Sequence, residues 1–406
     1  MDLSEIQKVL NEKKQEHILQ FYSELNIDDK LNLLKQIENI NWDSIQSGNT
    51  RNNKRGRITP LGAMEIDEIN SRREEFDMVG LKALQAGKLG AVLLAGGQGT
   101  RLGFDKPKGM LNVGIHKDLY LFEILIGNLL KVVNRIHTFV PLYIMISSIN
   151  YMDTTTFFHE NNYFGYDKSF IHFFMQEMTP SVDFNGKLLL EEKGKLSLSP
   201  NGNGGWFKSM DKAGLLQNVR DRGIEWLNVF SIDNVMQSIA DPSFLGAILL
   251  SDCDCGAKVV AKATPLERVG VLCQEDGKPS IVEYFDMTEE MINTKDDAGK
   301  LLYNYGVILN YIFSVESLLN TLDDNLPVYI VKKKIPHIRE DGNYIIPTEP
   351  NGYKFETLVL DMIKSMNSCL AYEVIREKEF APIKNKTGVD SLETARNILI
   401  LNGITI

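Results

Sequence analysis

A short apolar run that leads directly into a glycine-rich, basic loop constrains the fold of this chain more than any other feature. Residues 90–95 read Gly-Ala-Val-Leu-Leu-Ala, which is typical of a strand buried in a parallel sheet. Gly96, Gly97 and Gly99 follow at once, and without side chains they leave the backbone amides open to a phosphate group. Because open α/β folds bind ligands beyond the carboxyl ends of their strands, we expect a ligand at this loop.

The same loop carries three cations, Arg101, Lys106 and Lys108. Glycines alone are a weak signal, but glycines and cations directly after a strand indicate a polyphosphate site. Two common phosphate motifs do not fit this spacing. A Walker A loop needs a lysine after its last glycine in a frame that the chain lacks. A dinucleotide fingerprint needs a third glycine where Leu102 stands. The alternative is a structural glycine-rich turn with exposed cations.

Strand and helix patterns alternate beyond the loop, which predicts an α/β fold whose mostly parallel sheet is covered by helices on both faces. Residues 119–136 have the spacing of an amphipathic helix. Further buried strands are predicted at residues 142–147, 170–175 and 226–232. An antiparallel addition is predicted from strands at residues 258–263, 270–274, 281–284 and 305–309.

Helical spacing dominates the chain ahead of the first buried strand. It covers the first 45 residues, where Asp2 and Glu5 can form a capping pair, and again residues 65–86. We therefore expect three domains. They are a helical N-terminal domain at residues 1–88, a central domain at residues 89–363 and a small C-terminal domain at residues 364–406.

Composition and charge limit the classes of partner that the protein is expected to bind. A net charge of −10 argues against DNA and anionic membranes, although a few local cations suffice for a nucleotide. The four cysteines lack zinc-site spacing, which favours free thiols in a reducing compartment. The first 16 residues are charged and amphipathic, unlike a signal peptide, and no apolar run is long enough to span a bilayer. We expect a cytoplasmic protein that binds neither nucleic acid nor membrane and acts as a monomer.

The loop resembles the signature of a known enzyme family. The pattern L-x-G-G-x-G-T-R-L-G at residues 94–103, followed by Pro-Lys-Gly at 107–109, is similar to eukaryotic-type UDP-sugar pyrophosphorylases. Gln98 and the Thr100-Arg101 pair resemble the UDP-N-acetylglucosamine branch rather than the UDP-glucose branch. Other segments follow in the family's order, at residues 200–205, 233–234, 240–242, 255–260, 282–284, 350–352 and 380–385. The resemblance covers about residues 60–386 and implies a Rossmann-like nucleotide-diphospho-sugar transferase core.

For the nucleotide, the resemblance implies that the start of the loop holds the uracil and that Lys108 contacts the UTP phosphates. The nucleotide-binding positions that it implies, besides Lys108 and Asp233, are Leu94, Ala95, Gly96, Gly97, Gln176, Gly202 and Lys354. Arg101 would face the departing diphosphate. Asp233, at the end of an apolar strand, would bind Mg²⁺, with Mn²⁺ as an alternative. From the residues alone, Lys108 or Arg101 could instead form a surface salt bridge. Gln176 could cap a strand end, and Asp233 could form an Asx turn or helix cap.

For the sugar phosphate, the resemblance implies four more contacts. Asn203 would hydrogen-bond the sugar, Glu283 would accept from sugar hydroxyls, and Lys384 would contact the phosphate. Gly270 would let the acetamido group approach the backbone, although glycine in a strand also indicates a bulge. One position departs from the family: Val307 stands where a second asparagine is usual, which leaves the choice of hexosamine open.

The activity implied is the transfer of uridylate from UTP to N-acetylglucosamine 1-phosphate, with Mg²⁺ and release of diphosphate. The predicted catalytic residues are Arg101, Lys108 and Lys384. Two alternatives remain. One is the same chemistry on glucose 1-phosphate or on several sugar 1-phosphates. The other is a non-catalytic protein that binds a UDP-sugar.

Overall fold

The computed structural model describes residues 2–46, 55–324 and 326–406. The chain forms two compact units, and each is described here by itself. We call residues Arg55–Gln176, Trp206–Asn325 and Val359–Ile406 the sheet unit, and residues Met1–Lys54, Glu177–Gly205 and Leu326–Leu358 the N-terminal unit. The domain boundaries expected after residues 88 and 363 stay a prediction.

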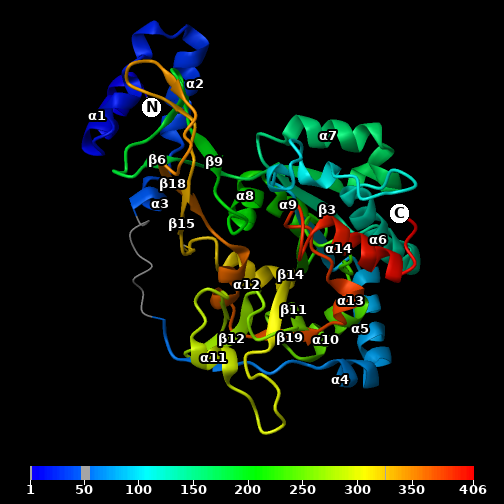
Figure 1. The fold of residues 1–406 in the computed structure, drawn as a ribbon. Helices are drawn as coiled ribbons and strands as arrows, with labels where there is room; N and C mark the ends of the chain where they lie inside the picture. Colours follow the sequence, from blue (N-terminus) through cyan, green and yellow to red (C-terminus); the bar gives the residue numbers. More distant parts are fainter. Residues whose placement is uncertain (1, 47–54, 325) are drawn as a thin grey trace. The chain divides into compact units, whose positions relative to one another are not determined.

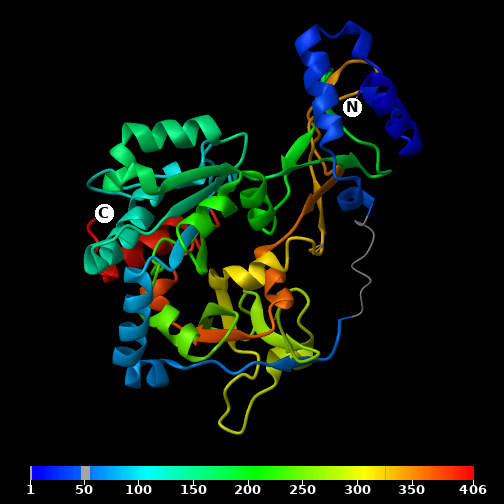
Figure 2. The same ribbon diagram turned by 180° about the vertical axis from the view of Figure 1, so that it is seen from behind.

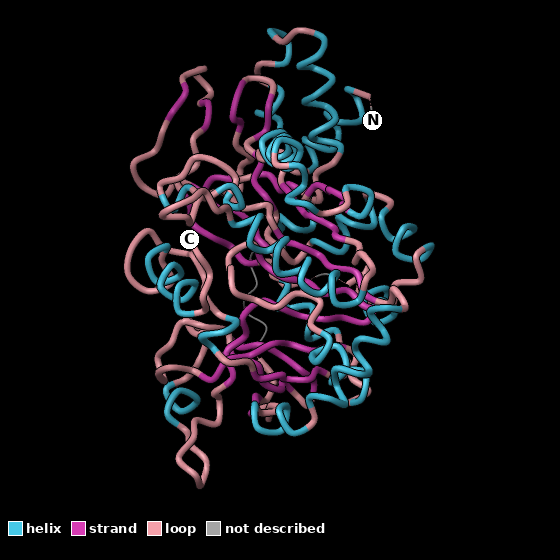
Figure 3. Tube along the Cα trace, turned by 90° about the vertical axis from the view of Figure 1, so that its right-hand side faces the viewer, coloured by secondary structure: helices cyan, strands magenta, loops and turns pink. Residues whose placement is uncertain are grey.

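A parallel half-sheet forms the centre of the sheet unit (Figures 1 and 3). Its strands are β2 (Leu89–Leu94), β3 (Leu142–Ile146), β4 (Ile171–Met175) and β10 (Trp226–Ser231), in the order β10-β2-β3-β4. From β2 the chain adds β3 and β4 on one side and then returns to place β10 on the other. The carboxyl ends of β2 and β10 therefore flank a topological switch point, where open α/β sheets bind their ligands.

Antiparallel strands extend the same sheet beyond β10, as expected. The first is β14 (Tyr305–Ser314), which pairs antiparallel with β10. The other antiparallel strands are β1 (Ile58–Pro60), β11 (Cys255–Ala261), β12 (Val271–Glu275) and β13 (Lys278–Val282), and β19 (Cys369–Glu373) pairs parallel with β11. The α/β fold is thus confirmed, with strand ends that differ from the prediction. β14 runs five residues past Leu309, whose φ of 55° marks an irregularity that breaks the alternation of side chains.

Helices cover both faces of the parallel strands. Leu142, Ile144 and Ile146 of β3 belong to the main core together with α6 (Leu121–Ile136). On the opposite face, the hydroxyl of Tyr143 donates to Asn218 of α9 (Leu215–Asp221) at 2.8 Å. Other helices of the unit are α4 (Ile66–Ser71), α5 (Arg73–Gln85), α7 (Tyr151–Glu160), α8 (Trp206–Lys212), α10 (Pro242–Leu250), α11 (Glu289–Asn293), α12 (Val315–Leu319), α13 (Arg376–Glu379) and α14 (Leu392–Leu401).

Helices α5 and α10 pack closely because each has a glycine at the crossing. A Cβ on Gly80 would overlap the carbonyl of Pro242, and one on Gly246 would overlap the carbonyl of Phe76. The single helix expected at residues 65–86 is two helices, because the chain leaves helical geometry at Arg72 between α4 and α5.

The N-terminal unit packs helices on small sheets, and Figure 2 shows it from behind. Helix α1 (Leu3–Glu12) begins with the expected capping box of Asp2 and Glu5. Ile6 of α1 and Leu33 of α2 (Ile27–Glu38) share a core with Phe355. The remaining elements are α3 (Trp42–Gln46), β5 (Met178–Pro180), β6 (Val182–Asp183), β7 (Leu190–Glu192), β8 (Lys195–Leu196), β9 (Leu198–Pro200), β15 (Tyr329–Lys333), β16 (His337–Ile338), β17 (Tyr344–Ile345) and β18 (Gly352–Glu356). Within the described parts of the chain, no helix has both the length and the apolar character needed to cross a membrane.

Candidate active site

The glycine-rich loop leaves the carboxyl end of β2 and folds back on itself. The amide of Ala95 still donates to Met145 of β3, at 2.9 Å. Beyond it, the amide of Gly99 donates to the carbonyl of Lys106 at 3.0 Å, and the amide of Lys108 donates to that of Gly97 at 3.3 Å. These bonds close the loop and bring Lys108 back beside the first glycines.

Two glycines of the loop differ in what surrounds them. A Cβ on Gly96 would overlap the side-chain oxygen of Gln176, so the structure brings these two predicted nucleotide residues into contact. A Cβ on Gly97 would meet no atom within 4 Å. The open space at Gly97 is where a ligand can approach the backbone without displacing protein atoms.

A buried asparagine that the sequence reasoning missed fixes the start of the loop. Asn150 is 0% exposed, and its side-chain nitrogen donates to the carbonyl of Ala95 at 3.1 Å. Its side-chain oxygen accepts from the amide of Ser147 at 2.7 Å. The available signal was the polar run Ser-Ser-Ile-Asn directly after the apolar residues of β3.

Lys108 and Asp233 form an ion pair at the switch point. The Nζ of Lys108 donates to Oδ1 of Asp233 at 2.6 Å, although 125 positions separate the two residues. The lysine side chain is 10% exposed and the aspartate side chain 36%. The structure therefore places the two predicted residues together at the ends of β2 and β10, and it leaves one side of the carboxylate open to solvent.

Asp233 is suited to be one ligand of a metal that arrives with phosphates. Mg²⁺ in nucleotide sites is often bound by one or two carboxylates, with phosphate oxygens and waters completing its shell. Among the described residues, no group of three or more His, Cys, Asp or Glu side chains could hold a metal by itself. The donor set thus fits a metal–triphosphate complex and does not form an all-protein metal cage.

Further exposed cations lie on the segments that carry this pair or are bonded to them. Within the described residues, the side chains of Arg101 and Lys384 are exposed and form no hydrogen bond or ion pair. Lys384 follows Ile383, whose amide donates to the carbonyl of Asp233 at 2.9 Å. Lys386, which the sequence reasoning missed, has its Nζ 3.7 Å from the position that a Cβ on Gly103 would occupy. It stands just past the matched Phe-Ala-Pro-Ile-Lys-Asn segment, so no motif pointed to it.

Three residues that the sequence analysis connects with the sugar lie together beside the hairpin of β12 and β13. They are Gly270, Glu283 and Val307. A Cβ on Gly270 would lie 3.7 Å from Oε2 of Glu283 and 3.5 Å from Cγ2 of Val307. The amide of Val307 also donates to the carbonyl of Gly270 at 2.9 Å. The one departure from the family's pattern therefore lies directly beside the two residues expected to contact the sugar.

The other three predicted residues belong to the N-terminal unit. Gly202 has a φ of 86°, and a Cβ on it would overlap the backbone of Thr357. The loop that carries Gly202 and Asn203 is tied to the end of β18 by the amide of Gly204, which donates to the carbonyl of Thr357 at 2.9 Å. Lys354 lies within β18, where burial, and then repulsion by Lys333, lowers its pKa below the ordinary lysine value.

Comparison with known proteins identifies the family. The sequence model of the UTP–glucose-1-phosphate uridylyltransferase family matches residues 26–402. The chain belongs to this family. A Saccharomyces cerevisiae relative named UDP-N-acetylglucosamine pyrophosphorylase is 34% identical over 95% of this chain and 84% of that protein.

Two further relatives agree. The Homo sapiens protein named UDP-N-acetylhexosamine pyrophosphorylase-like protein 1 is also 34% identical, over 95% of this chain and 82% of its own length. The crystal structure of the uridine diphosphate N-acetylglucosamine pyrophosphorylase from Trypanosoma brucei superimposes with a TM-score of 0.84. It is 27% identical and covers 98% of this chain and 84% of that one. The resemblance read from the loop and the α/β core are both confirmed.

Proposed function

We propose that this chain transfers the uridylyl group of UTP to N-acetyl-α-D-glucosamine 1-phosphate, forming UDP-N-acetylglucosamine and diphosphate. The observation that carries the proposal is the Lys108–Asp233 pair at the switch point, 2.6 Å long and flanked by the open side of Gly97. Membership of a uridylyltransferase family and the names of the relatives support the same activity.

The reaction needs alignment and charge neutralisation more than acid–base chemistry. An oxygen of the sugar phosphate attacks the α-phosphorus in line, and the bond from that phosphorus to the diphosphate oxygen breaks. Because the nucleophile is already an anion, no general base is required. Holding two polyanions together then accounts for most of the barrier, which fixed cations and positioning lower.

The residues of the sheet unit divide this work. Lys108 neutralises the triphosphate, and Arg101 the departing diphosphate. Lys384, whose exposed side chain forms no hydrogen bond or ion pair within the described residues, neutralises the sugar phosphate. Mg²⁺, or Mn²⁺ in its place, would be held by Asp233 with phosphate oxygens and would supply further neutralisation.

Other roles stay predictions from the sequence resemblance. They are the nucleotide contacts of Gly202 and Lys354, the sugar contact of Asn203, the action as a monomer, the cytoplasmic location, and the lack of nucleic acid and membrane partners.

A diphosphate-release assay tests the proposal. UTP, Mg²⁺ and N-acetylglucosamine 1-phosphate are supplied to the purified chain, and glucose and N-acetylgalactosamine 1-phosphates are tested in parallel. We expect the highest kcat/KM with an N-acetylhexosamine 1-phosphate. A higher value with glucose 1-phosphate would replace the proposed acceptor. No release with any acceptor, together with calorimetric binding of UDP-N-acetylglucosamine, would make the chain a binding protein instead.

A further inference from the structure

A buried lysine outside the substrate-facing residues holds together two segments of the sheet unit. Lys258 of β11 is 0% exposed, and its Nζ donates to Oδ2 of Asp241 at 2.7 Å and to Oε2 of Glu379 at 2.6 Å. An unpaired buried ammonium would cost several kcal/mol, so the two carboxylates are required partners. The motif around Lys258 was noted in the sequence, but no substrate role uses it.

Each carboxylate is fixed to a different segment. Asp241 caps α10, where its Oδ1 accepts from the amide of Ser243 at 3.0 Å. Glu379 ends α13, and its carboxylate also accepts from the amide of Ser238 at 3.1 Å. Lys258 therefore fastens the segment at residues 238–241 to the end of α13.

Both segments continue into the candidate active site. Asn234, only 2% exposed, follows Asp233 directly. Its side-chain nitrogen donates to the carbonyl of Glu379 at 2.7 Å, and its side-chain oxygen accepts from the amide of Ala381 at 2.9 Å. With the bond from the amide of Ile383 to the carbonyl of Asp233, these contacts run from Glu379 up to the residue before Lys384.

We infer that Asn234, Lys258 and Glu379 are positioning residues that hold Lys384 in fixed register with Asp233. We call these three residues the clamp. The inference rests on the proposed function, because it assigns the clamp a purpose in the reaction of those two residues. The side chain of Lys384 has no hydrogen bond or ion pair of its own in the described structure, so its placement depends on the backbone. The clamp holds that backbone ahead of Lys384, and the carbonyl of Asp390 accepts from the amide of Lys384 at 2.6 Å. Catalytic groups displaced by about 1 Å commonly lose about a hundredfold in rate, so such a device has a measurable effect.

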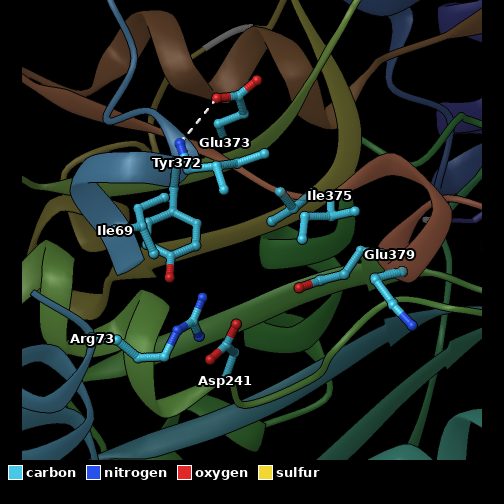
Figure 4. A pocket seen from close by; sticks show the side chains of 10 residues that line it. Ile69, Arg73, Asp241, Tyr372, Glu373, Ile375 and Glu379 are labelled. Atoms are coloured by element: carbon cyan, nitrogen blue, oxygen red, sulfur yellow. Dashed lines mark hydrogen bonds between the residues drawn. The ribbon is translucent and has the colours of Figure 1, made fainter. Parts of the chain in front are cut away.

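A pocket gives access to the clamp from outside. Its volume is about 220 Å³, and Asp241 and Glu379 line it together with Ile69, Arg73 and Tyr372. Figure 4 shows both carboxylates on its wall. A small alkylammonium ion can therefore reach the carboxylates when the lysine side chain is removed.

Kinetics of matched variants test the inference. Glu379→Leu removes the carboxylate, whereas Glu379→Gln keeps an oxygen that accepts from Lys258 and Ser238. We expect Glu379→Leu to lower kcat/KM for the sugar 1-phosphate by about tenfold or more, with the KM for UTP changed by less than about twofold. Glu379→Gln should recover most of the activity. Lys364→Met is the control, because it breaks the 2.6 Å ion pair with Glu275, elsewhere in the same unit. It should lower the melting temperature and leave both kinetic constants unchanged.

Two further variants cover the case in which Glu379→Leu does not fold. Asn234→Ser removes the side-chain bonds to Glu379 and Ala381 without disturbing a buried charge and should show the same selective loss. Lys258→Ala should regain activity when ethylammonium is added, since that ion fits the vacated volume. A folded Glu379→Leu or Asn234→Ser variant with kinetics like those of Lys364→Met would overturn the inference.

A second readout separates this inference from the proposed function. Amide hydrogen exchange at residues 379–384, measured by mass spectrometry, should accelerate in Asn234→Ser and not in Lys364→Met. If the wild-type chain releases no diphosphate with any acceptor, the proposed function fails while exchange still decides whether the clamp orders this segment. Unchanged exchange in Asn234→Ser would overturn the clamp even in an active enzyme.

Discussion

Replacing Lys108 by methionine removes the ammonium that lies 2.6 Å from Oδ1 of Asp233 and keeps most of the side-chain length. The change should have little effect on folding. Asp233 is 36% exposed, so solvent screens the pair and its loss costs about 1 kcal/mol of unfolding free energy or less. The effect on catalysis should be far larger, because the same cation is proposed to neutralise the triphosphate.

The size of that effect follows from the charges. Two unit charges about 4 Å apart interact by about 1 kcal/mol in water and by about 4 kcal/mol at an effective dielectric constant of about 20. A hundredfold loss of kcat corresponds to about 2.7 kcal/mol and falls within this range. We therefore expect kcat to fall by about a hundredfold or more, as for the loss of one electrostatic stabiliser.

The measurement is diphosphate release at saturating UTP, Mg²⁺ and sugar 1-phosphate, with thermal melting as the test of folding. The matched control is Lys88→Met, which breaks the ion pair of Lys88 with Glu225 at the opposite, amino ends of β2 and β10. It should keep wild-type kcat. In the double variant Lys108→Met/Asp233→Asn, the losses should be less than additive, because the two side chains are in contact and act on the same triphosphate. A folded Lys108→Met variant with kcat within threefold of the control would refute the reasoning.

Three further changes give separate tests. Gly97→Ala should leave the melting temperature unchanged, because nothing lies within 4 Å of the new Cβ, yet raise the KM for UTP; an unchanged KM would remove the nucleotide from this face of the loop. The lowered pKa of Lys354 means that its ammonium is lost, as pH rises, earlier than in an ordinary lysine. Affinity for UTP should therefore fall as pH rises through that lowered pKa, and Lys354→Arg, which stays charged, should move the fall to higher pH; identical pH profiles would exclude a phosphate contact. Val307→Asn should change the ratio of the kcat/KM values for the N-acetylglucosamine and N-acetylgalactosamine 1-phosphates. The change should correspond to about 1–2 kcal/mol of activation free energy, the scale of one hydrogen bond. A constant ratio would mean that residue 307 does not contact the sugar.

The sequence was sufficient for features that depend on local pattern. The apolar run of β2 and the glycines after it place a loop at a strand's carboxyl end, and the structure agrees. Asp233 was likewise found because it ends the apolar run of β10. Periodicity and turn chemistry determine such elements before any distant contact forms.

Long-range pairing was not accessible in this way. The ion pair of Lys108 and Asp233 joins residues 125 positions apart, and each is compatible with several partners when read alone. The N-terminal unit shows the same limit. Its strand β18 pairs with β6, a strand of two residues that carries no usable periodic signal. Contacts of this kind depend on the three-dimensional packing of separate segments, which one sequence without its relatives does not display.

Lys258 combines these two cases, because one part of its environment follows from the sequence and the other part only from the fold. The sequence predicted a strand at residues 258–263, and β11 spans Cys255–Ala261 with Lys258 inside it. A lysine buried in such a strand must find an anionic partner. That much follows from the sequence. Which carboxylates serve as partners does not, since Asp241 and Glu379 come from segments that only the fold brings together. The bonds of Asn234 and of the Ile383 amide place the backbone of residues 379–383 against Asp233. Lys258, which holds the side chain of Glu379, is thereby connected to the geometry of the site. A buried charge can thus act beyond its effect on stability, because in this arrangement it is coupled to the position of Lys384.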